Sequence, residues 1–168
     1  AQNVAVGKGA MYANTTGTRN IAIGHDAYDH SDTENDNLAI GYQAMTVNTA
    51  GGIQNIAIGN YALDGLTSGD SNVAIGYSAM SATVTGGQNT AVGNSAMEVL
   101  TTGATNTAVG YVSLDALTTG SNNTAVGWSS LGATTTADDN TAVGKNSMLI
   151  NTEGYSNTAI GIYSLRQN

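Results

Sequence analysis

A five-residue motif, Asn-x-Ala-(Val/Ile)-Gly, recurs ten times along this 168-residue chain. Successive copies begin seventeen positions apart, as from Asn3 to Asn20, except that one further residue separates Asn37 from Asn55. A fixed period of this length over the whole chain is typical of a solenoid, in which each repeat forms one coil stacked on the previous coil. The sequence therefore predicts one repeat domain over residues 1–168, with coils that begin at Asn3, Asn20, Asn37, Asn55, Asn72, Asn89, Asn106, Asn123, Asn140 and Asn157.

Within each coil, the motif predicts a short strand that ends at a glycine. If the Asn is position 1, position 3 is always Ala, position 4 is Val or Ile and position 5 is Gly. Recurrent Gly, Asn, Thr and β-branched residues disfavour a helix. Positions 8–11, with a small residue followed by Met, Leu or (once) Tyr28, predict a second strand, and a Thr-rich turn leads to the next coil. We therefore expect an all-β parallel β-solenoid, with coils about 4.8 Å apart in a rod on the order of 45–50 Å long.

Equivalent side chains of stacked coils lie above one another. The residue type at an invariant position must therefore be able to stack on the same residue type in the next coil. The Asn at position 1 is expected to form a ladder of side-chain amides. The Gly at position 5 is expected to take a backbone conformation that a Cβ atom excludes. The extra residue of the third coil, within Gly51-Gly52-Ile53-Gln54, is expected to bulge from a turn and leave the ladder in register.

The predicted first strand carries apolar residues on both faces. Positions 2 and 4 point to one face, and the Ala at position 3 points to the other. Position 2 is Val, Ile or Leu in the first five coils and Thr in the last five. We expect position 4 to be buried, as at Val92 and Val109. One thin coil cannot cover both faces, so either the Ala face is exposed or several chains associate along the rod, and we favour association.

The chain is acidic, with a formal net charge of −8 from 12 acidic and 4 basic residues. This charge disfavours binding to nucleic acid or to an anionic membrane surface. No apolar run approaches the length of a membrane span, so we expect no membrane insertion by this segment. The absence of cysteine excludes disulfides and thiolate metal sites. Low charge and abundant Asn, Thr, Ser and Gly favour an extracellular, cell-surface or virion fibre.

The motif copies resemble the head repeats of trimeric surface fibres. Asn72-Val73-Ala74-Ile75-Gly76 resembles the YadA-type head of trimeric autotransporter adhesins. Asn106-Thr107-Ala108-Val109-Gly110-Tyr111, with Thr118-Thr119-Gly120 after it, is similar to bacteriophage tail-fibre repeats. The resemblance implies a left-handed β-roll, a homotrimer and attachment to a host surface. The YadA-type unit is usually shorter than the repeat of this chain, so the handedness of the coil is open.

Aromatic residues recur at position 6, directly after the strand. Such side chains stack on sugar rings, and the candidate ligand contacts are Tyr42, Tyr77, Tyr111 and Trp128. Asn60 and Asn94 interrupt this row, so we expect no continuous platform. The alternative is that the aromatic rings cover small apolar edges of neighbouring coils or chains.

The second coil contains both histidines and several carboxylates. Imidazole and carboxylate groups bind metals, and the candidate ligands are His25, Asp26, Asp29 and His30. Their spacing matches no known metal motif, so we expect an acidic solvated loop and no cofactor. Threonines at positions 13 and 14, together with the Thr at position 2 of the last five coils, invite comparison with ice-binding solenoids, but residues such as Asp32 and Glu153 break the ladder at positions 13 and 14.

The sequence contains no recognisable Ser/His/Asp set, phosphate loop or recurrent carboxylate pair, so we expect no enzymatic activity. The leading hypothesis is a structural segment of an extracellular or virion fibre, an adhesin head or phage tail fibre, that attaches to a host surface. The alternatives are a specialised binding solenoid (glycan, ice or metal) and, less favoured, a polysaccharide-acting enzyme. The repeats begin and end without a polar cap, which predicts a piece of a longer fibre or a self-assembling filament subunit.

Overall fold

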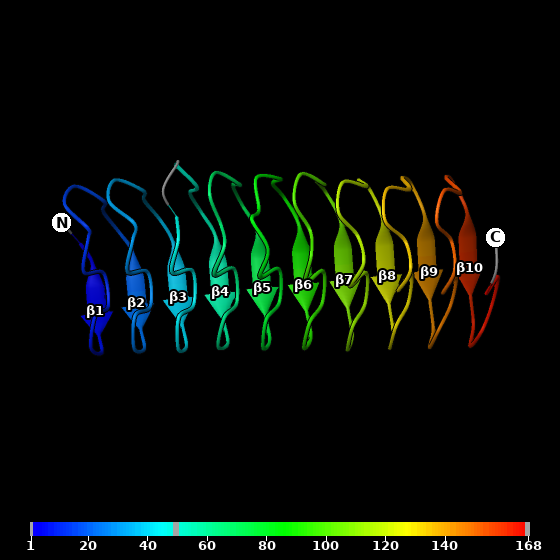
Figure 1. Cartoon of the computed structure of the whole chain (residues 1–168), viewed down its shortest axis with the longest axis horizontal. Helices are drawn as coiled ribbons and strands as arrows, with labels where there is room; N and C mark the ends of the chain where they lie inside the picture. The colour runs from blue at the N-terminus through cyan, green and yellow to red at the C-terminus, as the bar shows by residue number, and fades with distance from the viewer. Residues whose placement is uncertain (1, 49–50, 167–168) are drawn as a thin grey trace.

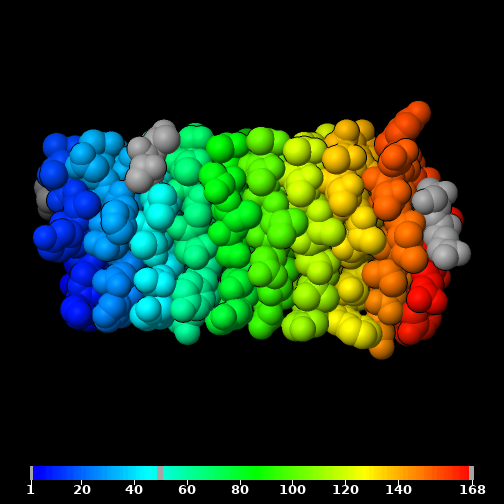
Figure 2. Space-filling model, in the orientation of Figure 1, coloured from blue at the N-terminus to red at the C-terminus, as the bar shows by residue number. Residues whose placement is uncertain are grey.

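The computed structural model describes residues 2–48 and 51–166 and shows an all-β parallel solenoid. Ten strands of three residues each lie side by side in one sheet, in the order in which they occur along the chain (Figure 1). The coils form successive bands along a straight rod (Figure 2). The predicted fold class is confirmed. The strands are β1 (Val4–Val6), β2 (Ile21–Ile23), β3 (Leu38–Ile40), β4 (Ile56–Ile58), β5 (Val73–Ile75), β6 (Thr90–Val92), β7 (Thr107–Val109), β8 (Thr124–Val126), β9 (Thr141–Val143) and β10 (Thr158–Ile160).

Every strand pairs in parallel with the strand of the next coil, with motif alanine opposite motif alanine. β3 and β4 keep this register although the coil between them contains the extra residue, and Ala39 lies opposite Ala57. The prediction that the extra residue leaves the ladder in register is therefore confirmed. Residues 49–50, next to the predicted bulge at 51–54, lie outside the described residues.

The prediction of a second strand at positions 8–11 is wrong, because each coil in the described ranges has one strand followed by turns. Residues at positions 7 and 9 take positive φ angles, 51° at Gln43 and 50° at Met45. Their N–H groups consequently point in opposite directions along the rod. Gln43 N–H donates to the His25 carbonyl of the preceding coil (3.0 Å), and Met45 N–H donates to the Ala62 carbonyl of the following coil (2.9 Å). The turns thus satisfy the backbone without a second strand.

Within the single chain, the prediction that position 4 is buried is also wrong. The Ala at position 3 points into the coil and is buried in β2 to β10, whereas the Val or Ile at position 4 points outward. Val92 is half-buried and Val109 is 38% exposed. Larger side chains from position 9, such as Met97 and Leu114, fill the interior, so the strand contributes only a methyl group there. The alternative of an exposed Ala face is excluded for these nine strands.

The asparagines at position 1 form the expected amide ladder in the second half of the rod. Each Asn Oδ1 accepts the backbone N–H of the next Asn, as between Asn72 and Asn89 (3.0 Å). From Asn89 to Asn157, each Nδ2 also donates to the Oδ1 of the preceding Asn, at 3.1–3.3 Å. Nδ2 donates in addition to a carbonyl of the following turn, as from Asn89 to Gly103 (2.9 Å). These bonds offset the desolvation of buried amides and hold neighbouring coils together.

The motif glycine directly follows each strand, as expected, and its conformation explains why position 5 is invariant. Gly127 has φ 133°, a region that L side chains rarely adopt. A Cβ atom on Gly127 would lie 2.6 Å from the carbonyl oxygen of Gly144 in the next coil. Both the backbone angle and the close stacking of coils therefore require glycine.

Candidate functional site

The outward side chains of positions 2 and 4 form a stripe two residues wide along the whole sheet, which we name the outer stripe. In β1 to β5 both rows are Val, Ile or Leu, and in β6 to β10 position 2 is Thr while position 4 is Val or Ile. None of these residues carries a charge. In the middle of the rod, the exposed fraction is 36% at Ile75 and Val126 and 38% at Val109. The outer stripe is thus a regular, mostly apolar surface open to solvent.

Four aromatic rings from successive coils form a continuous line beside the outer stripe, which we name the aromatic row. His25 stacks on Tyr42 with ring centres 5.4 Å apart and planes at 27°. Tyr61 packs edge-on between Tyr42 (5.4 Å) and Tyr77 (5.7 Å). The expectation that Asn60 interrupts the aromatics is therefore wrong here, because Tyr61 at position 7 fills the gap. The adjacent Asn60-Tyr61 pair was the sequence signal for this contact.

The phenol groups of the aromatic row are close enough to influence one another. Desolvation raises the pKa of Tyr61, and the neighbouring Tyr42, Tyr77 and Asp64 raise it further. Tyr42 and Tyr77 are 40% and 53% exposed. The row therefore presents ring surface and hydroxyl groups to solvent at the same place.

The other two aromatic candidates lie outside the aromatic row. Asn94 occupies position 6 between the coils of Tyr77 and Tyr111, as the sequence indicates. Tyr111 is 55% exposed. The ammonium group of Lys145 lies 4.1 Å from the centre of the Trp128 ring, which is a cation–π contact between neighbouring coils. One face of Trp128 is therefore already occupied.

The four candidate metal ligands form two separate pairs. His25 Nδ1 lies 2.9 Å from Asp26 Oδ2, and His30 Nδ1 lies 3.6 Å from Asp29 Oδ2. Across residues 2–48 and 51–166, no group of three or more His, Cys, Asp or Glu side chains is arranged to hold a metal ion. His25 instead begins the aromatic row.

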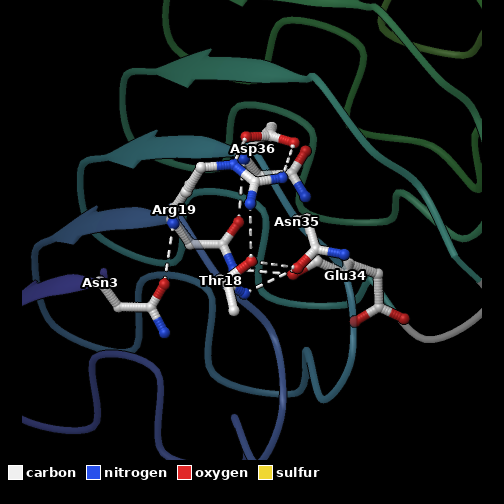
Figure 3. Close-up of polar contacts among 8 residues, drawn as sticks. Asn3, Thr18, Arg19, Glu34, Asn35 and Asp36 are labelled. Carbon is white, nitrogen blue, oxygen red and sulfur yellow. Dashed lines mark hydrogen bonds and ion pairs between the residues drawn. The ribbon is translucent and has the colours of Figure 1, made fainter. Parts of the chain in front are cut away.

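Polar side chains link the coils at the opposite end of the strands, at positions 16 and 17 (Figure 3). Arg19 makes a two-point ion pair with Asp36 of the next coil, at 2.5 and 2.7 Å. This hydrogen bonding raises the pKa of Arg19 and lowers that of Asp36. Thr18 donates from its backbone and hydroxyl to Asn35 Oδ1, at 2.7 and 2.8 Å.

A shallow polar groove of about 440 Å³ lies at the same end of the strands, in the middle of the rod. It is lined by Gln54, Ser68, Asp70, Ser71, Thr85, Gly87, Gln88 and Ala104. The outer stripe thus has polar side chains at one edge and the aromatic row at the other.

Comparison with protein-family models, curated proteins and solved structures finds no match to this chain. In the part of the chain that the structure describes, no helix is long and apolar enough to cross a membrane.

Proposed function

We propose that this chain is a non-enzymatic structural segment of an extracellular or virion fibre that serves in attachment to a host surface. The outer stripe is the observation that supports this function. Folded monomers rarely expose a contiguous apolar surface over their whole length, and such surfaces are typical of association sites. A rod with an apolar stripe along one side can pack side by side with other parallel chains in a fibre.

The partner that fits the outer stripe best is another copy of the same chain. Parallel copies have the same axial repeat, so their side chains match from β1 to β10. A partner without this repeat would match only over a few coils. The absence of charge on the stripe also favours self-association, because the net charge of −8 is then kept on the outside of the assembly. By resemblance to trimeric fibre heads, we expect three chains with left-handed coils around a common axis.

Light scattering on the purified chain tests this proposal, with a particle of three chains as the expected result. Ile75→Lys with Val126→Lys places charges on the outer stripe and should dissociate the assembly while circular dichroism stays unchanged. The matched control is Val99→Lys with Ile150→Lys, since these residues are similarly exposed (41% and 39%) but lie outside the sheet. A wild-type monomer, or dissociation by the control alone, would overturn the proposal.

The second half of the outer stripe supports one alternative, an ice-binding solenoid. Thr90, Thr107, Thr124 and Thr141 are half-buried, face outward in register and alternate with Val. Their β-branched side chains are restricted at χ1, which makes this array more regular than the broken ladder at positions 13 and 14. A monomer with thermal hysteresis that Thr107→Lys abolishes, and exposed Thr102→Lys does not, would favour this function over the fibre.

A further inference from the structure

We infer that the aromatic row is a binding track for a neutral, unbranched glycan chain that lies parallel to the rod axis. This inference rests on the proposed function in attachment, for which it names the class of ligand and the residues that contact it. The contact residues are His25, Tyr42, Tyr61 and Tyr77.

The geometry of the aromatic row requires an elongated ligand. Its rings come from four successive coils, and neighbouring ring centres are 5.4, 5.4 and 5.7 Å apart. A single sugar covers only part of this line. A linear polysaccharide presents one ring after another, so successive sugars contact successive aromatic side chains.

The chemistry of the row fits sugar rings. The C–H face of a pyranose packs on an aromatic ring, while the sugar hydroxyls at its edge need polar partners. The three tyrosine hydroxyls supply donors and acceptors beside the exposed rings. Asn60 is exposed next to Tyr61, and its Oδ1 accepts the backbone N–H of Tyr42 (2.9 Å), so its amide group lies close to the row. Tyr binds in this way at low entropic cost because it has few rotatable bonds.

Charge selects a neutral glycan over an anionic one. The chain carries a net charge of −8, and Asp26 and Asp64 lie beside the row. His25 is the one basic residue among the four rings. Sulfated or carboxylated chains are therefore repelled.

A proline-rich peptide is the other extended ligand that aromatic side chains bind. Such peptides dock in grooves lined by aromatic residues. The rings here lie in single file, and the polar groove of the rod lies at the opposite end of the strands. This arrangement favours the glycan.

Calorimetric titration of the assembled chain tests the inference. The probes are linear β-1,4-glucan, α-1,4-glucan and β-1,4-mannan oligosaccharides of increasing length, with heparin and a polyproline peptide for comparison. We expect affinity for one neutral series to rise with oligosaccharide length until the chain spans the four rings. Tyr42→Ala with Tyr77→Ala should then weaken binding about tenfold or more, from the loss of two aromatic contacts.

Two further variants test whether the rings of the aromatic row are responsible for glycan binding. Tyr42→Phe with Tyr77→Phe keeps the rings and should retain affinity within about threefold, whereas Tyr111→Ala with Tyr155→Ala removes exposed rings outside the row and should change nothing. Binding of heparin or polyproline alone, binding that survives the Tyr42→Ala, Tyr77→Ala change, or no binding to any neutral series would overturn the inference. Light scattering on the same samples separates this inference from the proposed fibre function. A trimer that binds no glycan would contradict the glycan-binding track and leave the fibre function standing.

Discussion

The backbone N–H and the side-chain Nδ2 of Asn106 both donate to Oδ1 of Asn89, at 2.9 and 3.1 Å. Both residues are fully buried, and they belong to neighbouring coils. Each amide in this ladder is the partner of the next one, so the loss of one side chain leaves unpaired groups in the coil that follows.

The first prediction concerns this ladder. Asn106→Ala removes the acceptor of the Asn123 N–H and the donor to the Gly120 carbonyl. We expect the free energy of unfolding, measured by urea titration, to fall by about 3 kcal/mol because both groups are left buried without partners. Asn94→Ala is the control, since Asn94 is exposed and its replacement should change stability by about 0.5 kcal/mol at most. Equal effects of the two changes would mean that the ladder contributes little.

The second prediction concerns the glycine at position 5. Gly127→Ala forces a Cβ onto a residue with φ 133° and against the carbonyl of Gly144, so we expect a loss of about 3 kcal/mol or more in thermal or urea unfolding. Gly132→Ala, in the turn that follows, meets only atoms 3.1 Å or more away, the nearest of them side-chain ends that can shift. This control should be tolerated; a similar loss in both variants would contradict the explanation.

The third prediction concerns alkaline pH. Burial raises the pKa of Tyr28 from 10.0 to about 12, although the hydrogen bond from Asn37 opposes this shift. Because this pKa is raised in the folded state, the protonated phenol of Tyr28 favours folding. Its contribution to the free energy of unfolding is complete below pH 10 and is lost as the pH rises through 12. We expect unfolding free energy to fall by about 2 kcal/mol between pH 9 and pH 12 for this reason.

Tyr28→Phe isolates this effect. The variant should lose about 1 kcal/mol at neutral pH, because Asn37 Nδ2 keeps its bond to the Gly52 carbonyl. Its stability should then decline less steeply than that of the wild type above pH 10. Parallel pH profiles for the two proteins would show that Tyr28 does not titrate in the folded state as described.

The fourth prediction concerns Asp64, whose Oδ1 is buried without a hydrogen-bond partner. Desolvation raises the pKa of Asp64, so its ionised form at neutral pH weakens the fold, and this effect disappears when acid protonates the carboxyl group. We expect Asp64→Asn to raise stability at pH 7 by up to about 1 kcal/mol and to have little effect at pH 3. Asp139→Asn, at an exposed position, should be neutral at both pH values. A gain that persists unchanged at pH 3 would exclude charge desolvation as its cause.

Most of the fold could be predicted from the repeat period. The ladder of strands, the register across the longer third coil and the glycine conformation all follow from equivalent residues stacking on one another. The positions of the aromatic contacts did not follow from the period, because Tyr61 lies at position 7 and its neighbours lie at position 6. The contact arises from the path of the turn, where positive φ at Tyr61 (61°) redirects the side chain toward Tyr42 and Tyr77.

The sequence by itself determined the coil length, the parallel order of the strands, the buried asparagine ladder and the need for glycine at position 5, because a fixed period stacks each residue on its own copies in the neighbouring coils. Only the tertiary structure decided which face of the strand is inside. The alternation of side-chain direction along the strand could not show which face is buried, since Ala at position 3 and Val or Ile at position 4 are both apolar. Met, Leu and Tyr28 at position 9 fill the narrow interior, so the smaller Ala faces inward and the larger residues form the outer stripe.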